Sequence, residues 1–526
     1  MSDVLRSALR AHFGYDTFRP GQEEAMRAVL AGRDVLAVMP TGAGKSLCYQ
    51  LPALLREELT IVVSPLVSLM ADQVAGLPQH AALINSQQDL ADNRETLARV
   101  RGGDVRLLYV APERFSTRGF IDALAGVRVA CFVVDEAHCV SQWGHDFRPD
   151  YFELPEAARA LAARQIFACT ATATPLVARD IAARLRLREP LLVATGFDRP
   201  NLSYVVVHAT NDTDRERRIA AVLADPAARP AIVYAGTRAR SDALASFLAA
   251  RIGTPVATYH AGLEREQRAE AQRRFMDGEV DVVVATNAFG MGIDKADVRT
   301  VCHAAVPESL EAYYQEAGRA GRDGEPARCL LFAANRDKGL HVHFIGQSAS
   351  GSARNARWAQ YRAIWAFVES SSCRRKQILE HFGDRSAPAM LPSVACCDIC
   401  APGSRPAPPV RPAPASESTP RPRQRHARAK PAQVELAELD RAILEVVISA
   451  RPSIGRTRTV EILRGGRSKL IAQNGYDSLE AYGAYAHLSA GEALAQVDGL
   501  IARGVLRSTG GRFPKLAAVT AVDSSG

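Results

Sequence analysis

Residues 34–46 read DVLAVMPTGAGKS, an apolar run that ends in a glycine-rich turn closed by Lys45 and Ser46. A helical pattern follows, so the stretch predicts a strand, a loop and a helix. Such a loop turns backbone N–H groups and a helix N-terminus toward phosphate. We expect Lys45 to reach the β- and γ-phosphates and Ser46 to bind Mg²⁺. Met39 replaces the usual first glycine, and a turn that binds no nucleotide is the alternative.

A second motif, Asp135-Glu136-Ala137-His138, ends the apolar run Ala130–Val134. Parallel sheets present their active sites at the carboxyl ends of their strands. We therefore expect Asp135 to hold Mg²⁺ and Glu136 to orient and deprotonate an attacking water. A surface acid after a buried strand is the alternative, which the presence of both motifs disfavours.

A third motif, Gln315-Glu316-Ala317-Gly318-Arg319-Ala320-Gly321-Arg322, carries two arginines three residues apart. Their spacing predicts one helical face. An arginine supplied by a neighbouring domain neutralises charge on a transferring phosphoryl group, worth about 10³–10⁵ in rate. We favour Arg322 for this role, with Arg319 close by; a solvated basic helix is the alternative.

Short runs rich in valine and isoleucine alternate with amphipathic stretches from about residue 10 to 340. This alternation predicts an α/β chain of parallel sheets wrapped by helices. About 330 residues suit two sheets, with a boundary near 200. The apolar runs are Asp34–Met39, Thr60–Ser64, Arg106–Val110, Ala130–Val134, Ala231–Tyr234, Val280–Ala285 and Arg299–His303.

The 526 residues carry a formal net charge of +8, which makes a polyanion a plausible partner. We see neither a signal peptide nor an apolar stretch near the ~20 residues that span a bilayer, and so expect no membrane association and a cytoplasmic protein. Cysteines in that compartment are free or metal-bound. Six of them read as small core residues: Cys48, Cys131, Cys139, Cys169, Cys302 and Cys329.

In this order the motifs resemble those of superfamily 2 helicases, and most specifically the RecQ family, over roughly residues 10–400. Other segments that carry the resemblance are Phe18–Gln22, Ser64–Met70, Ala111–Arg114, Thr170–Ala173, Tyr259–Leu263 and Ala285–Asp294. The resemblance implies two tandem RecA-like lobes, residues 1–200 and 201–340, with ATP and Mg²⁺ between them. It also implies 3′-to-5′ unwinding of DNA in repair, recombination or replication maintenance. The cofactor-binding residues that it implies are Arg19, Gln22, Thr41, Gly42, Gly44, Lys45, Ser46 and Asp294.

The segment Ser141–Pro149 looks like the aromatic-rich loop that separates RecQ proteins from the wider superfamily. An aromatic ring stacks on an unpaired base for ~1–3 kcal/mol whatever the base. Beside Glu136, such a loop is placed to couple single-strand binding to hydrolysis. The candidates are Trp143, Phe147 and Arg148; the alternative is that Trp143 and Phe147 pack the loop onto the sheet.

Four cysteines, Cys373, Cys396, Cys397 and Cys400, fall within residues 341–401, a segment that is helical and then cysteine-rich. Four thiolates gathered in a cytosolic chain indicate a structural, tetrahedral Zn²⁺ site. Cys396 and Cys397 are adjacent, whereas the commoner spacing of the family separates them by two residues. A disulfide or free thiols are the alternative.

Residues 402–433 form a Pro/Arg-rich stretch that we interpret as a mobile linker. Residues 434–520 resemble, more loosely, the winged-helix domain of RecQ proteins, with a wing at 508–514. A basic surface there is expected to grip duplex phosphates, or else is a scattered solvated face. Its residues are Arg456, Arg458, Arg464, Arg467 and Lys469.

The predicted partners are single-stranded and duplex DNA; a single-strand-binding protein or repair proteins are further possibilities that the sequence does not specify. If the source is bacterial, the protein is expected at the nucleoid. Two other functions stay open. The first is an RNA helicase of the same superfamily, which the aromatic loop and the cysteines disfavour. The second is a DNA-binding scaffold with a degenerate ATPase, which the intact Lys45, Asp135, Glu136 and Arg322 disfavour.

Overall fold

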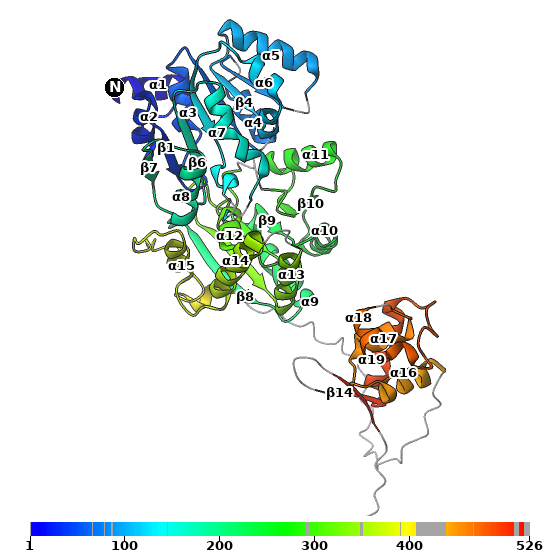
Figure 1. Cartoon of the computed structure of the whole chain (residues 1–526). Helices are drawn as coiled ribbons and strands as arrows, with labels where there is room; N and C mark the ends of the chain where they lie inside the picture. The colour runs from blue at the N-terminus through cyan, green and yellow to red at the C-terminus, as the bar shows by residue number, and fades with distance from the viewer. Residues whose placement is uncertain are drawn as a thin grey trace, which may run out of the picture. The chain divides into compact units, whose positions relative to one another are not determined.

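A computed structural model of the chain divides into two compact units, Met1–Pro412 and Ala413–Gly526 (Figure 1). The structure describes residues 2–65, 67–77, 79–85, 88–141, 143–144, 146–290, 295–347, 351–389, 391–406, 438–466, 468–509 and 515–519.

The first lobe is a seven-stranded parallel sheet in the order β3-β4-β2-β5-β6-β1-β7. Its central strands are buried along their whole length, as expected where helices cover both faces. The strands are β1 (Val35–Val38), β2 (Leu59–Val63), β3 (Ala81–Ile84), β4 (Leu107–Val110), β5 (Val129–Val134), β6 (Ile166–Thr170) and β7 (Leu191–Ala194). The helices are α1 (Ser2–Phe13), α2 (Gln22–Leu30), α3 (Leu47–Leu54), α4 (Val67–Ala75), α5 (Leu90–Gly102), α6 (Arg118–Ala123), α7 (Leu154–Ala160) and α8 (Pro175–Arg184).

The second lobe is a six-stranded parallel sheet in the order β10-β11-β9-β12-β13-β8. The two sheets confirm the predicted α/β class, and the chain crosses between them after β7. The strands are β8 (Leu202–His208), β9 (Ala231–Tyr234), β10 (Val256–Tyr259), β11 (Val282–Ala285), β12 (Thr300–His303) and β13 (Ala327–Ala333). The helices are α9 (Asp212–Leu223), α10 (Arg238–Ile252), α11 (Arg265–Met276) and α12 (Leu310–Ala317).

A helical segment follows the second sheet and carries three of the clustered cysteines beyond its last helix. Its helices are α13 (Asn335–Gly346), α14 (Gly351–Glu369) and α15 (Arg374–His381). Cys373 is the N-cap of α15 and Phe382 its C-cap. Buried side chains of this segment, including Trp365 and Phe382, join the same apolar core as the strands of the lobes.

The second compact unit is a small helical domain with a two-stranded antiparallel hairpin. Its core gathers Ile443, Val460, Leu463 and Leu500 from three helices around Leu516 of the hairpin. The elements are α16 (Glu438–Ser449), α17 (Arg456–Leu463), α18 (Lys469–Gln473), α19 (Ala490–Ala502), β14 (Leu506–Ser508) and β15 (Leu516–Ala518). The hairpin matches the predicted wing, although residues 510–514 lie outside the described residues, as does nearly all of the predicted linker.

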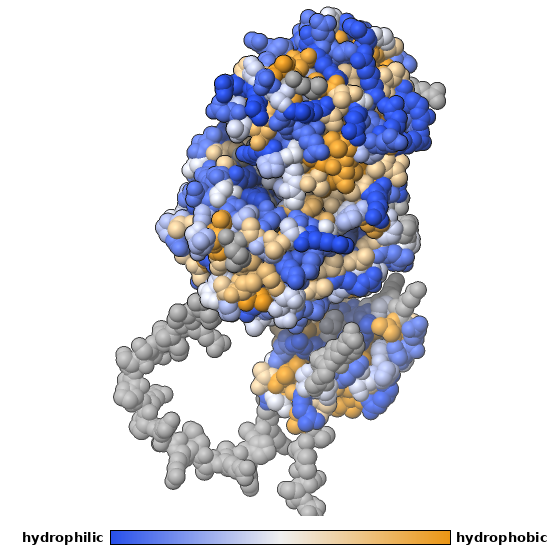
Figure 2. All heavy atoms as spheres, turned by 90° about the vertical axis from the view of Figure 1, so that its left-hand side faces the viewer, coloured by the Kyte–Doolittle hydropathy of each residue, from blue (hydrophilic) through white to orange (hydrophobic). Residues whose placement is uncertain are grey.

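The face viewed in Figure 2 is mainly hydrophilic, with apolar side chains gathered in small groups. Single exposed apolar residues are normal for a protein surface. Among the residues that the structure describes, no helix is both long enough and apolar enough to cross a bilayer.

Candidate functional site

The glycine-rich loop lies where strand β1 ends and helix α3 begins, with Ser46 as the helix N-cap. Gly44 has a φ of +77°, and a Cβ built there would lie 2.5 Å from Gln22 Nε2. Only glycine therefore fits this position without strain. The Lys45 ammonium donates to the Met39 carbonyl at 3.3 Å, so the lysine folds back across its own loop.

The segment before α2 holds this loop from the side. The backbone N–H of Arg19 donates to Gln22 Oε1 at 2.8 Å, which fixes the glutamine amide. Gln22 Nε2 then donates to the Ala43 and Gly44 carbonyls at 3.0 and 3.2 Å, and the Arg19 guanidinium donates to the Gly42 carbonyl. The structure thus brings Arg19 and Gln22, two of the residues that the resemblance implies for nucleotide binding, to the glycine-rich loop.

Asp135 follows β5 and is buried at the edge of the same site. Its Oδ1 accepts hydrogen bonds from the Cys169 thiol at 3.3 Å and from the Glu136 backbone N–H at 3.0 Å. Burial, followed by repulsion from Glu136, raises the pKa of Asp135 to about 6, while the Lys45 ammonium opposes that rise. Lys45 and the acid pair are therefore close enough to interact.

Glu136 adopts a left-handed backbone with φ of +48°, which is uncommon for a residue with a side chain. Its carboxylate lies 3.3 Å from His138 Nδ1, which also lies 2.9 Å from Thr170 Oγ1. Burial alone would lower the pKa of His138, but neighbouring Cys139 and Glu136 raise that pKa to about 10. The acid pair is thus linked through His138 to the segment that begins at Thr170.

The two arginines of the third motif do not share a helical face, so that prediction is wrong. Helix α12 ends at Ala317, and the chain then turns, with a φ of +54° at Gly321. Because of this turn the side chains diverge. A Cβ built on Gly42 would lie 3.8 Å from Arg322 Cγ, whereas one on Gly290 would lie 2.9 Å from Arg319 Nη2. Arg322 thus lies over the phosphate loop.

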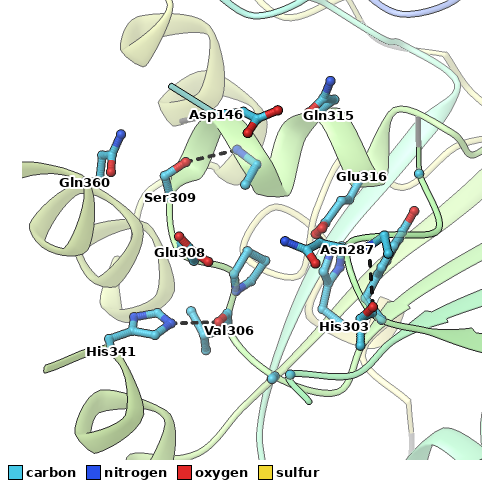
Figure 3. Close-up of a pocket in the computed structure, with 18 of the residues that line it drawn as sticks. Asp146, Asn287, His303, Val306, Glu308, Ser309, Gln315, Glu316, His341 and Gln360 are labelled. Carbon is cyan, nitrogen blue, oxygen red and sulfur yellow. Dashed lines mark hydrogen bonds and ion pairs between the residues drawn. The ribbon is translucent and has the colours of Figure 1, made fainter. Parts of the chain in front are cut away.

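A cavity of about 450 Å³ lies between the lobes. Glu136, His138 and Asp146 of the first lobe line it together with Gln315 and Arg319 of the second. Figure 3 shows Asp146 and Gln315 at the same end of this cavity. Residues from both lobes therefore face one space beside the acid pair.

Asp294, which the resemblance implies as a nucleotide-binding residue, lies outside the described residues.

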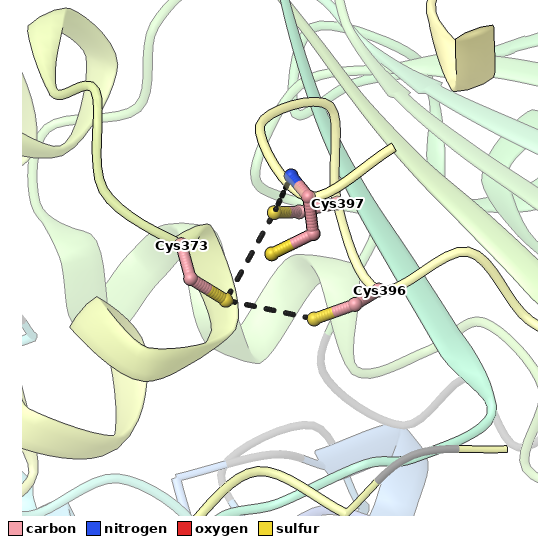
Figure 4. A group of neighbouring side chains, drawn as sticks. Cys373, Cys396 and Cys397 are labelled. Atoms are coloured by element: carbon pink, nitrogen blue, oxygen red, sulfur yellow. Dashed lines mark hydrogen bonds between the residues drawn. The ribbon is translucent and has the colours of Figure 1, made fainter. Parts of the chain in front are cut away.

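The four clustered cysteines converge (Figure 4), with their sulfur atoms all within 4.8 Å of one another. Cys373 Sγ lies 3.5 Å from Cys396 Sγ and 3.9 Å from Cys397 Sγ. A tetrahedron of thiolates around zinc, with Zn–S near 2.3 Å, has sulfurs about 3.8 Å apart. A hydrogen bond from the Cys396 thiol lowers the pKa of Cys397, while that same hydrogen bond raises the pKa of Cys396 and burial raises the pKa of Cys400. The donor set fits a structural zinc ion.

Family models match four consecutive stretches of the chain. They are the DEAD/DEAH box helicase at residues 19–181, the helicase conserved C-terminal domain at 215–324, the RecQ zinc-binding domain at 335–401 and the RQC domain at 430–522. The ATP-dependent DNA helicase RecQ of Bacillus subtilis is 37% identical over 516 residues, which cover 97% of this chain and 81% of the relative. The chain belongs to the RecQ family.

Other relatives extend this similarity. The ATP-dependent DNA helicase RecQ of Pasteurella multocida is 40% identical over 76% of this chain, which corresponds to 62% of the relative. The ATP-dependent helicase wrn-1 of Caenorhabditis elegans is 39% identical over 75% of this chain and 38% of its own length.

Solved structures share the fold alone. A crystal structure of the DUF1998 helicase MrfA bound to DNA has a TM-score of 0.54 at 19% identity, over 66% of this chain and 53% of that one. The DEAD-box helicase Mss116 bound to single-stranded RNA has a TM-score of 0.53 at 17% identity, over 71% of this chain and 85% of that one. Because one structure holds DNA and the other RNA, the fold does not distinguish the two.

The aromatic-rich loop of this RecQ chain leaves Trp143 42% exposed, whereas Phe147, 37% exposed, packs on Phe152 with ring centroids 5.2 Å apart. Arg148 pairs with Asp146 at 2.9 Å. The packing alternative therefore applies in part to Phe147, and Trp143 is available for stacking. Two other residues of the loop, Gln142 and His145, lie outside the described residues.

The RecQ zinc-binding segment is joined to edge strand β8 through contacts that the sequence analysis missed. Arg375 donates to the Pro200 and Leu202 carbonyls at 3.1 and 2.6 Å, and Cys397 forms a β-bridge with Tyr204. The adjacent Arg374 and Asp398, both buried, form an ion pair at 3.0 Å. The expected zinc ion would therefore stabilise a segment that completes the second lobe.

In the RQC unit, the predicted basic surface is partly neutralised by its own neighbours. Arg456 pairs with Asp498 at 2.8 Å, and Arg458 pairs with Glu461. Arg464 Nε donates to the Leu488 carbonyl at 2.8 Å. Arg467 and the side chain of Lys469 lie outside the described residues.

Proposed function

We propose that this protein is an ATP-dependent DNA helicase that moves 3′-to-5′ along one strand and separates the duplex. The observation that carries the proposal is the approach of Lys45, the Asp135–Glu136 pair and Arg322 to one loop, although they are far apart in the chain. Lys45 acts electrostatically on Asp135, and Arg322 Cγ lies close to Gly42.

The roles of these residues follow from their positions. Ser46 and Asp135 are the side chains that would hold Mg²⁺, which when bound would offset negative charge on the phosphates. Lys45 exchanges its bond to the Met39 carbonyl for the phosphates. Glu136 takes the proton of the attacking water, and Arg322 offsets charge on the departing phosphoryl group.

The remaining assignments complete the nucleotide and DNA sites. Gln22 recognises the adenine base and Arg19 binds the nucleotide, the backbone of Thr41, Gly42 and Gly44 cradles phosphate, and Asp294 is a further nucleotide-binding residue. Arg319, which lines the cavity with Glu136, is the second arginine that acts on the site from the second lobe. Trp143, Phe147, Arg148 and, in the RQC unit, Arg464 contact DNA.

We place the protein in the cytoplasm, and at the nucleoid if its host is bacterial. A zinc site built from reduced thiols suits a reducing compartment.

The proposal is tested by strand displacement on duplexes with a 3′ or a 5′ single-stranded tail, with and without ATP. We expect displacement only with ATP and only from the 3′ tail. Lys45→Ala is expected to abolish ATP hydrolysis while single-strand binding persists. Retained turnover in that variant would refute the assigned phosphate site.

The rival activity is RNA unwinding. The aromatic-rich loop and the zinc-binding segment favour DNA. ATP hydrolysis measured with matched DNA and RNA single strands decides between them, and stronger stimulation by RNA would overturn the proposal.

A further inference from the structure

An arginine in the segment that joins the two lobes donates four hydrogen bonds to main-chain carbonyls. Arg199 Nη1 donates to Thr41 of the phosphate loop at 3.4 Å and to Gly318 at 3.2 Å. Its Nη2 donates to Ala320 at 3.0 Å and to Gly321 at 2.9 Å. One guanidinium is thus bonded to the phosphate loop of the first lobe and to the turn that precedes Arg322 in the second.

The turn itself is folded by bonds that stay within the second lobe. The backbone N–H of Gly321 donates to the Val298 carbonyl at 2.9 Å, and Asn201 Nδ2 donates to the Gly321 and Glu325 carbonyls at 2.8 and 2.9 Å. These bonds hold the shape of the turn. The guanidinium of Arg199 in addition holds the turn in place relative to the phosphate loop.

The chemistry of this contact requires an arginine. A planar guanidinium presents its donors as a rigid fork, and here two nitrogens reach four acceptors. A lysine ammonium is a single point at the end of a flexible stem and does not span the same carbonyls. The turn also lies close to the loop directly, since a Cβ built on Gly318 would lie 3.7 Å from Thr41 Cβ.

We propose that Arg199 is a positioning residue for ATP hydrolysis, which holds the turn of residues 318–322 against the phosphate loop so that Arg322 stays over the phosphates. It acts through Arg322 and touches no nucleotide itself. The inference rests on the proposed function, because it requires Arg322 to act on the transferring phosphoryl group.

The test compares Arg199→Gln and Arg199→Lys with Arg322→Ala and with the double variant Arg199→Gln/Arg322→Ala. Arg56→Gln is the matched control. Arg56 is also half-buried and caps two carbonyls, those of Val29 and Leu30 at 3.0 and 2.7 Å, but entirely within the first lobe. DNA-stimulated kcat and KM are measured for each, with the affinities for ADP and for ADP with aluminium fluoride.

Displacement of a reacting group by about 1 Å costs on the order of 10²-fold in rate. We expect Arg199→Gln to lower kcat by about that factor, with KM and ADP affinity within about threefold of wild type. Affinity for ADP with aluminium fluoride, which mimics the transferring phosphoryl group, should fall in parallel with kcat. Arg199→Lys should restore less than about a tenth of the loss, and Arg56→Gln should leave kcat unchanged.

The double variant decides whether Arg199 acts through Arg322. Two residues that act as a unit give losses that do not add, so the double variant should be no slower than Arg322→Ala. Multiplicative losses, or full rescue by lysine, would overturn the inference. If the Arg199→Gln variant does not fold, the double variant Arg199→Lys/Arg322→Ala is compared with Arg322→Ala in its place. Full turnover in Arg322→Ala would instead contradict the proposed function.

Discussion

Asp135 should be costly to the stability of the free protein, so replacing it by asparagine should stabilise the fold while abolishing hydrolysis. The carboxylate is buried, adjoins Glu136, and has a pKa raised from 3.8 to about 6. Asparagine keeps the Oδ1 that accepts from the Cys169 thiol and the Glu136 backbone. It removes the buried charge and with it a ligand for Mg²⁺.

The size of the effect follows from linkage. A group whose pKa is higher in the folded protein binds more protons when folded, so stability falls as the pH rises through that interval. A rise from 3.8 to about 6 corresponds to ~3 kcal/mol. The cost is absent below about pH 3, about half present at pH 5 and complete above about pH 7.

The assay is thermal unfolding of wild type and Asp135→Asn from pH 5 to pH 8, without nucleotide or Mg²⁺. Asp135 belongs to the compact unit Met1–Pro412, for which ~3 kcal/mol raises the melting temperature by roughly 3–4 °C at pH 7, and by about half as much at pH 5.

Asp34 provides the control at the opposite end of the same sheet. Its buried carboxylate accepts backbone N–H bonds from Ile166 and Arg188 at 2.8 and 2.6 Å. Asp34→Asn loses an ionised acceptor and should therefore lower the melting temperature at pH 7. An Asp135→Asn variant that is less stable than wild type at pH 7, or equally stabilised at pH 5 and pH 7, would refute the reasoning.

Three further outcomes are expected. Trp143→Ala should weaken single-strand binding by ~1–3 kcal/mol in fluorescence anisotropy at fixed salt, and Phe147→Ala should weaken it less, because that ring is partly occupied by packing; equal losses would contradict the different exposures. Cys397→Ser should lower the zinc content of the purified protein and its melting temperature, and a full equivalent of zinc would count against the four-cysteine site. Asp398→Asn leaves the buried Arg374 without its charge partner, so it should cost ~3–5 kcal/mol in the free energy of unfolding, and a loss below ~1 kcal/mol would show that the pair is not needed.

Most of the strands that lie inside the two sheets could be predicted from their apolar runs. The seven apolar runs became β1, β2, β4, β5, β9, β11 and β12. The edge strands β3, β7, β8 and β10 were missed, and so were the internal strands β6 and β13, although both are largely buried. Strands β7 and β10 are only partly buried, so they lack the continuous apolar run that marks a central strand. Strand β8 is an edge strand that forms a bridge to the zinc-binding segment, through Tyr204 and Cys397, and this contact is distant in sequence.

The candidate site divides in the same way. Lys45, the acid pair and the cysteines were found because their chemistry depends on side-chain type at fixed spacing. Arg199 was missed because it bonds to carbonyl oxygens, which every residue presents, so the sequence of Thr41 or Ala320 carries no trace of the contact. The prediction that Arg319 and Arg322 share a helical face failed for a related reason. The helix ends at Ala317 and the chain turns at Gly321, so the helical spacing does not apply to these two residues. Side-chain motifs therefore identify the groups that act on the nucleotide, whereas main-chain contacts set where those groups stand. Variants that change only the latter are the direct way to separate placement from chemistry in this site.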